Sequence, residues 1–293
     1  MIRAHCYWLA GVIAALWLLG AMPSHAQWIE APGTGWVKLQ VAHQDTRDRF
    51  DENGTVEPYF NEGARSITTT VRLSAAIGLL RGLDAWMDVP YYRLAFNDVV
   101  RDRLTTGVAD PRLFLRVGPS LLGAGEWPLA LALRGGVKFP VGDFQLDAEQ
   151  ISLSQGQRDW ELLLEVGKSL HPWPLYLMGW AGYRWREANT DIGRKPGDER
   201  LIYVAAGGSV GSFGWKVALD GQFGRPPVRR DFGGIRLSRD RRELVQLVPT
   251  LSWALGPGAV EAGAQLPLRG RNLPAGPAFT LGYFLSWDRP LWE

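Results

Sequence analysis

The sequence predicts an all-β fold, a single up-and-down antiparallel transmembrane β-barrel of about twelve strands that follows a cleaved signal peptide. The first observation is the stretch Ser66–Leu79, in which apolar residues alternate almost without interruption with polar or small ones. The second is that similar two-sided stretches recur along the chain, separated by alternately long and short connections. The third is the character of the N-terminus, residues 1–26.

The alternation in Ser66–Leu79 has a period of two residues, which is the period of a β-strand with two different faces. One face runs from Ile67 to Leu79 and is apolar, whereas the other carries Arg72. The stretch is longer than the usual strand of a soluble domain. A tilted strand needs roughly 9–11 residues to cross the hydrocarbon layer of a membrane. We therefore expect this strand to span a membrane.

The N-terminal residues divide the chain into a signal peptide, 1–26, and a barrel, 27–293. Trp8–Ala21 is an apolar run of about 14 residues, shorter than the roughly 20 that a spanning helix needs. Pro23 ends the run, and small residues at Ser24 and Ala26 suit a cleavage site. An N-terminal membrane anchor is the alternative. The one cysteine, Cys6, lies in this peptide, so neither disulfides nor thiol chemistry is expected in the mature chain.

The composition argues against one class of partner and favours a β-rich protein. Among 293 residues, 32 Lys and Arg stand against 30 Asp and Glu, a net charge of +2. No basic run is present, so nucleic acid is not an expected partner. Glycine (35) and tryptophan (14) are abundant, which suits strands joined by turns and anchored by aromatic residues at membrane interfaces.

The order of strands and connections is typical of bacterial barrels. Strands are predicted at 35–46, 66–79, 83–95, 109–118, 127–139, 158–169, 174–187, 200–211, 214–225, 243–255, 259–269 and 277–288. Long connections are predicted at 47–65, 96–108, 140–157, 188–199, 226–242 and 270–276. Barrels of the Gram-negative outer membrane have an even number of strands, short periplasmic turns and longer outer loops. We therefore predict the bacterial outer membrane as the location. A soluble β-sandwich with solvated loops is the alternative.

The apolar strand faces are nearly free of charge, which predicts outer-membrane lipid as a partner. In 127–139, for example, that face carries Leu131, Leu133 and Val137. A Lys or Arg on a lipid face at mid-membrane costs about 2–4 kcal/mol, which explains the exclusion. Aromatic residues near strand ends predict two interfacial girdles. These residues are Trp36, Trp86, Trp127, Trp173, Trp215, Trp253 and Trp287 at the short-turn end, and Trp160, Trp185, Tyr91, Tyr92 and Tyr203 at the loop end.

Two prolines complicate the assignment of faces. Pro90 and Pro249 each lie inside a predicted strand, and a proline there usually marks a bulge or an edge. A bulge at Pro90 would reverse the faces of the residues beyond it. The side to which Arg93 points is therefore left open.

The polar strand faces predict the lining of the lumen. The candidate lumen-lining residues are Arg72, Arg112, Arg116, Arg134, Lys138, Glu161, Glu165, Arg184, Lys216 and Asp220, with Lys38, Gln40, Asp84, Asp88, Arg186, Gln222, Glu261, Gln265 and Arg269 on the same faces. In one interpretation these charges pair and fill a narrow barrel. In the other they form a charged constriction that filters solutes. Small residues such as Gly136 and Gly208 leave room for a pore.

Catalytic and metal-binding residues are not predicted. The mature chain has two histidines, His43 and His171, and neither has an evident serine and carboxylate near it in the sequence. No metal-ligand spacing is present, and no cofactor is expected. Outer-membrane phospholipases and lipid A deacylases share the strand number, but their nucleophile motif is not found. The chain is therefore predicted not to be an enzyme, with a lipid-hydrolysing barrel as the alternative.

Short motifs resemble those of a known family. GVADPRLFLRVG (107–118) and GVKFPVGDF (136–144) are similar to segments of the MetA-pathway of phenol degradation family, and YFNEG (59–63) adds a further match. GYFLSW (282–287) resembles the last-strand signal read by the barrel-insertion machinery. The resemblance implies an outer-membrane channel or uptake barrel for small solutes, including hydrophobic or aromatic ones, without catalytic residues. A plugged structural barrel is the other alternative, and the oligomeric state is open.

Overall fold

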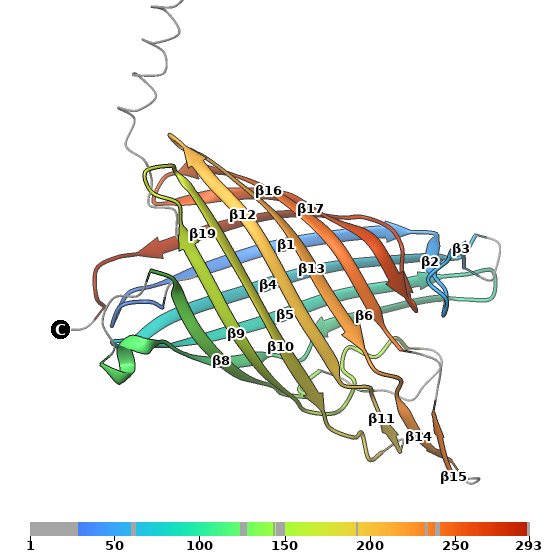
Figure 1. The fold of residues 1–293 in the computed structure, drawn as a ribbon. Coiled ribbons are helices and arrows are strands. Elements are labelled where there is room, and N and C mark those ends of the chain that lie inside the picture. Colours follow the sequence, from blue (N-terminus) through green and yellow to red (C-terminus); the bar gives the residue numbers. More distant parts are fainter. Residues whose placement is uncertain are drawn as a thin grey trace, which may run out of the picture.

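A computed structural model describes residues 29–59, 63–123, 128–142, 144, 150–191, 193–231, 234–237 and 241–291. The main strands form one antiparallel sheet that closes on itself through the pairing of β4 with β5 (Figure 1). The strands of this sheet are β1 (Gly35–Thr46), β4 (Arg65–Leu80), β5 (Leu83–Asn97), β6 (Asp102–Val108), β7 (Arg112–Val117), β8 (Ala130–Lys138), β9 (Asp159–Ser169), β10 (Leu175–Arg186), β12 (Glu199–Val210), β13 (Phe213–Gly224), β16 (Glu243–Leu255), β17 (Gly258–Arg271) and β19 (Ala278–Trp287). The predicted signal peptide, with Cys6, lies outside the described residues.

The closed wall has the twelve strands that the sequence predicts, because β6 and β7 together occupy one position. Both pair with β5, β6 along residues 91–97 and β7 along residues 83–88. Residues 109–111 interrupt this position in the wall, and Pro111 lies there. The prediction of a single up-and-down antiparallel barrel is thus confirmed.

The two ends of the barrel differ as expected. Short turns join neighbouring strands at the end where the C-terminus lies, and one of them contains the 3-10 turn η1 (Pro119–Leu122). At the other end the long loops form small additional strands (Figure 1). These are β2 (Asp48–Phe50), β3 (Val56–Pro58) and β18 (Leu273–Pro274) in one sheet, and β11 (Arg194–Lys195), β14 (Val228–Asp231) and β15 (Gly234–Leu237) in another.

The predicted long loop at 96–108 is wrong. The chain turns within 98–101 and continues as β6, which extends the wall beyond the predicted strand 109–118. Asp98 stabilises this turn, because its Oδ1 accepts hydrogen bonds from the backbone N–H of Arg101 (2.9 Å) and Val100 (2.8 Å). Those two donors hold the pKa of Asp98 below its ordinary value. The polar residues of β6 on both faces resemble a loop in the sequence, which explains the error.

A proline inside a strand was expected to mark a bulge or an edge, and neither Pro90 nor Pro249 produces a bulge at its own position. The ladder between β4 and β5 keeps one register through the pair Arg72–Pro90. The Pro90 carbonyl accepts the Ala109 N–H at 2.9 Å, so the missing proline donor faces the interruption at 109–111. Arg93 is consequently exposed on the outer face.

The irregularity expected near Pro249 lies elsewhere, between Val245 and Gln246. There Gln246 faces Pro267 and Val245 faces Arg269, which leaves Leu268 as the extra residue. Arg269, expected in the lumen, is turned to the outer face and is exposed.

The outer face of the barrel presents large apolar side chains to the surroundings. Leu39, Val204 and Leu281 are 52%, 57% and 60% exposed. Apolar surface on this scale is a liability in water, whereas a lipid layer accepts it. No helix in the described part of the chain is long and apolar enough to span a membrane. A closed barrel with such an outer face is an outer-membrane protein.

The predicted aromatic girdles are only partly correct. Tyr91, Trp160, Trp173, Trp185, Trp215 and Trp253 are exposed on the outer surface. Trp36, Trp86, Tyr92 and Tyr203 instead point into the lumen, since they share the faces of the charged residues on their strands. Trp287 donates its Nε1–H to the Gly33 carbonyl at 3.0 Å. Trp127 lies outside the described residues.

Candidate functional site

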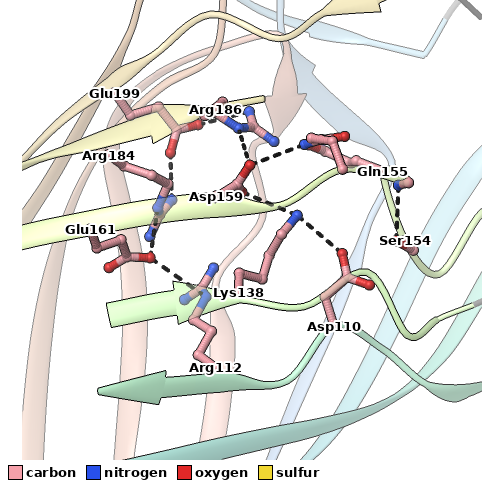
Figure 2. Close-up of polar contacts among 12 residues, drawn as sticks. Asp110, Arg112, Lys138, Ser154, Gln155, Asp159, Glu161, Arg184, Arg186 and Glu199 are labelled. Carbon is pink, nitrogen blue, oxygen red and sulfur yellow. Dashed lines mark hydrogen bonds and ion pairs between the residues drawn. The ribbon is translucent and has the colours of Figure 1, made fainter. Parts of the chain in front are cut away.

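The candidate site is the lumen, and charged side chains are concentrated on one part of its wall. We call β7, β8, β9, β10 and β12 the charged wall. At the outer end of this wall, eight charged residues form a continuous chain in which cationic and acidic side chains alternate (Figure 2). Seven of them lie on the charged wall and Asp110 lies just before β7. In order, the members are Asp110, Lys138, Asp159, Arg186, Glu199, Arg184, Glu161 and Arg112.

The strand register explains this chain. Lys138 lies directly opposite Arg112, and like charges at such a position repel. Lys138 resolves the conflict by contacting two carboxylates, Asp110 and Asp159, each at 3.1 Å from its Nζ. Arg184 contacts Glu161 at 2.8 Å and also pairs with Glu199. Each of these short contacts joins neighbouring strands, so the network cross-links the wall.

A second ion-pair network lies deeper in the wall and is more completely buried. Arg116 contacts Asp84 at 2.5 Å and Glu165 at 3.4 Å, and Arg134 contacts Glu165 at 3.0 Å. The Arg116 and Asp84 side chains are 1% and 0% exposed. Buried charges are tolerated only when they are paired in this way.

Aromatic rings surround the two arginines of this network. The Arg116 guanidinium carbon lies 4.5 Å from the centre of the Trp86 ring. The Arg134 guanidinium carbon is 5.2 Å from Trp86, 5.2 Å from Phe114 and 5.7 Å from Trp180. Such cation–π contacts compensate for part of the lost hydration. Trp180 in turn stacks on Tyr203 with ring centres 5.3 Å apart.

Glycine at position 136 makes room for one of these rings. A Cβ atom at Gly136 would lie 2.0 Å from the Phe114 ring. Space that the sequence suggested for a pore is therefore filled by the ring at this position. Gly208, by contrast, does line a cavity.

The opposite part of the lumen carries fewer charges, and we call β13, β16, β17, β19 and β1 the open wall. Lys38 contacts Glu261 at 2.5 Å across this wall. Asp220 accepts a hydrogen bond of 3.0 Å from Gln246 Nε2. Lys216 has no carboxylate within ion-pair distance among the described residues. Small side chains such as Thr250 occupy much of the remaining surface.

Two cavities lie inside the barrel, one toward each end. The inner cavity, at the short-turn end, has a volume of about 530 Å³, and the outer cavity about 750 Å³. Of the predicted lumen-lining residues, Arg116 and Lys216 line the inner cavity, whereas Arg72, Arg112, Lys138 and Arg184 line the outer one. Arg134, Glu161, Glu165 and Asp220 belong to the lumen wall but line neither cavity.

The charge lining the two cavities differs. Among the described lining residues, the inner cavity has three cationic and three acidic residues. The outer cavity has eight cationic and five acidic ones. A mobile anion therefore meets an attractive potential in the outer cavity and a balanced one in the inner cavity.

Residues 150–158 of the loop between β8 and β9 fold inward at the outer end. The Ile151 N–H donates to Thr105 Oγ1 at 3.0 Å. Leu153 packs against Gly107 on the lumen side of β6. Asn189 donates its side-chain N–H to the Gln155 carbonyl at 2.8 Å. This segment consequently forms part of the outer cavity lining.

Residues 29–34 lie at the inner mouth of the barrel. The Glu30 N–H donates to Asp84 Oδ2 at 2.9 Å. At the end of β4, the Gly33 N–H donates to the Gly78 carbonyl and the Gly78 N–H donates to the Thr34 carbonyl, each at 2.9 Å. Burial raises the pKa of the Glu30 carboxyl group, Arg116 opposes this, and Asp84 and Asp288 add to it. Glu30 also lines the inner cavity.

The sequence interpretation missed several lumen residues. Trp36 and Trp86 were assigned to a lipid interface, although they share the faces of Lys38 and Asp84. Strict use of that parity would have placed them inside. Asp110 was not foreseen, because its role depends on the interruption between β6 and β7.

The two histidines are apart from the lumen networks. His43 lies on the exposed outer face with its Nδ1 2.9 Å from Thr69 Oγ1. His171 lies in the exposed turn between β9 and β10. The described residues contain no group of three or more side chains suited to hold a metal ion.

Fold and lumen together define an outer-membrane β-barrel with a charged interior. An outer membrane channel from Pseudomonas putida F1 is similar in structure, with a TM-score of 0.73, 16% identity, and coverage of 92% of this chain and 100% of that one. OmpT of Vibrio cholerae has a TM-score of only 0.40 at 8% identity, covering 89% of this chain and 100% of that one. No protein-family model matches the chain, and no curated protein matches it either.

Proposed function

We propose that this protein is an outer-membrane channel or uptake barrel through which small solutes pass. The observation that carries the proposal is the pair of lumen cavities, about 530 and 750 Å³, left between the charged wall and the open wall. A barrel filled by its own side chains would not leave volumes large enough to contain a small molecule. The similarity in fold to a solved outer membrane channel supports the same conclusion.

The motifs that resemble the MetA-pathway of phenol degradation family support a family assignment, which we also propose. Lys138 of one motif contacts Asp110 of the other at 3.1 Å, and the Gly142 N–H donates to Asp110 Oδ1 at 3.3 Å. The two motifs thus form one structural unit that closes the interruption beside β7. Under this assignment the solutes include hydrophobic or aromatic molecules, and the last strand is the signal for the barrel-insertion machinery.

The proposed function is tested with purified, refolded protein in planar lipid bilayers and in liposomes. We expect discrete conductance steps and swelling of liposomes in small solutes. Protein that shows the heat-dependent gel mobility of a folded barrel, yet gives neither signal, would favour the plugged structural barrel. Fatty-acid release from phospholipid or lipopolysaccharide, abolished by His43→Ala or His171→Ala, would instead favour the lipid-hydrolysing alternative.

A further inference from the structure

Two arginines of the outer cavity, Arg72 and Arg112, are held more loosely than Arg184 and Arg186, which form the short ion pairs of the charged wall. Arg72 Nη1 lies 3.7 Å from Asp88 Oδ2, and Arg112 Nε lies 3.7 Å from Glu161 Oε1. Charge-assisted hydrogen bonds between these groups are normally 2.7–2.9 Å long. Among the described residues, neither guanidinium has a shorter contact with a carboxylate. Their hydrogen-bonding capacity toward carboxylates is therefore not used.

The carboxylates near these arginines are engaged elsewhere. Glu161 Oε1 accepts from Arg184 Nε at 2.8 Å. Asp88 Oδ1 accepts from Ser74 Oγ at 2.7 Å. Each of these two carboxylates thus has its shortest contact with a group other than Arg72 or Arg112. The structure keeps both guanidinium groups available to a third partner.

The two arginines open into the same space. Arg112 lies opposite Asp88 on β5, and Arg72 lies opposite Pro90 on the other side of β5, so both flank one short strand segment. Their side chains are 41% and 31% exposed although they lie inside the barrel. Both line the outer cavity, where cationic residues outnumber acidic ones.

Apolar groups continue the same surface. On β5 the lumen face beyond Asp88 carries Pro90, Tyr92 and Leu94, and each of these lines the outer cavity. Leu153 of the infolded loop lines it as well. A solute held here thus meets a pair of guanidinium groups on one side and an apolar surface next to them.

We propose that the outer cavity binds small aromatic or alkyl carboxylates, with the solute carboxylate between Arg72 and Arg112 and its apolar part on Pro90, Tyr92 and Leu94. Planar guanidinium groups match a carboxylate in geometry and charge. The proposal deepens the proposed channel function and rests on it for passage of the solute. Binding itself is measured independently of conductance.

The test uses the full mature chain in detergent micelles, with sodium benzoate as the anionic probe and benzyl alcohol as the uncharged probe of similar size. Calorimetry is expected to show binding of benzoate in preference to benzyl alcohol. The double variant Arg72→Gln with Arg112→Gln is expected to bind benzoate about tenfold more weakly or worse, because charge-assisted hydrogen bonds are lost. Arg93→Gln makes the same kind of change once on the outer face, where it removes one positive charge, and should bind as the unaltered protein does.

Three outcomes would overturn the inference. They are absence of benzoate binding, equal binding of benzyl alcohol, or unchanged benzoate affinity in the double variant. If inorganic phosphate competes as well as benzoate does, the apolar surface has no role and the carboxylate assignment fails. Should the double variant not fold, Arg112→Lys keeps the charge but loses the planar donor pair, and an intermediate loss of benzoate affinity is expected.

Bilayer recordings separate this inference from the proposed function. In a KCl gradient, the double variant should shift the reversal potential toward cation preference, while Arg93→Gln should not. Conductance with an unshifted reversal potential and unchanged benzoate affinity would refute the carboxylate site alone. Benzoate binding by a folded barrel without any conductance would refute the channel alone.

Discussion

The charged wall and the open wall of the same barrel solve different problems. In the charged wall, arginines and carboxylates on neighbouring strands pair closely, as at Arg184–Glu161 (2.8 Å), and aromatic rings cover the remaining faces. In the open wall, the Lys38–Glu261 pair stands among small or neutral residues such as Thr250. The comparison indicates that one wall supplies rigidity, whereas the other leaves the cavity volume that the proposed channel function requires.

The largest difference is expected in stability. Arg116→Ala removes the partner of Asp84, which is buried with 0% exposure, and should lower the free energy of unfolding by about 3–5 kcal/mol. Lys38→Met, in a pair whose side chains are about one-fifth exposed, should cost about 1 kcal/mol or less. Urea unfolding in lipid vesicles measures both. Similar losses in the two variants would show that the walls are equally rigid.

Conductance, unlike stability, should be more sensitive to a folded substitution in the open wall than to one in the charged wall. Thr250→Trp places a large ring in the inner cavity from the open wall, and we expect a folded barrel whose conductance is reduced on the order of twofold. Ala132 in the charged wall is 4% exposed, so Ala132→Trp has no room and should prevent folding. Single-channel recordings measure the conductance, and heat-dependent gel mobility shows whether each variant folds. A folded Ala132→Trp barrel with normal conductance would contradict the assignment of close packing to the charged wall and free volume to the open wall.

A pH effect is expected at the inner mouth, where the two walls meet residues 29–34. Burial raises the pKa of Glu30, so the docked segment favours the protonated carboxyl group. Docking is then strongest below the ordinary carboxyl pKa and weakens as the pH rises through the raised value. Glu30→Gln should remove this dependence. Hydrogen exchange of the backbone amides of residues 31–34 measures this docking, compared at each pH between the unaltered protein and Glu30→Gln. Identical pH profiles in the two proteins would refute the role given to Glu30.

The smallest effect is expected on the outer surface, remote from both walls. His43→Ala and His171→Ala change exposed residues, and each should alter the free energy of unfolding by less than about 0.5 kcal/mol. Conductance should remain unchanged as well. A large loss of conductance in either variant would mean that the solute path does not run through the charged and open walls.

Errors in the sequence-based interpretation occurred where strands depart from simple pairing. The bounds of β1, predicted as 35–46, are those of the structure, because its alternation is clear. Residues 102–108 were predicted to be a loop, since the outer face of β6 mixes Leu104 and Val108 with Asp102 and Thr106, and such a mixed face shows no clear alternation. The bulge at Leu268 moved Arg269 from the expected lumen to the outer face.

The sequence by itself predicted the barrel class, since strands long enough to span a membrane alternate in period two and are joined by alternately long and short connections. It also indicated which residues carry charge toward the interior wherever no bulge intervenes, because parity along a strand is a local property, and Arg269 beyond the bulge is the exception. Only the tertiary structure decided which charges pair, since closure brings distant strands together, as in the contact of Lys38 on β1 with Glu261 on β17. It alone also placed Arg72 and Arg112 each 3.7 Å from the nearest carboxylate, the observation on which the proposed carboxylate site rests.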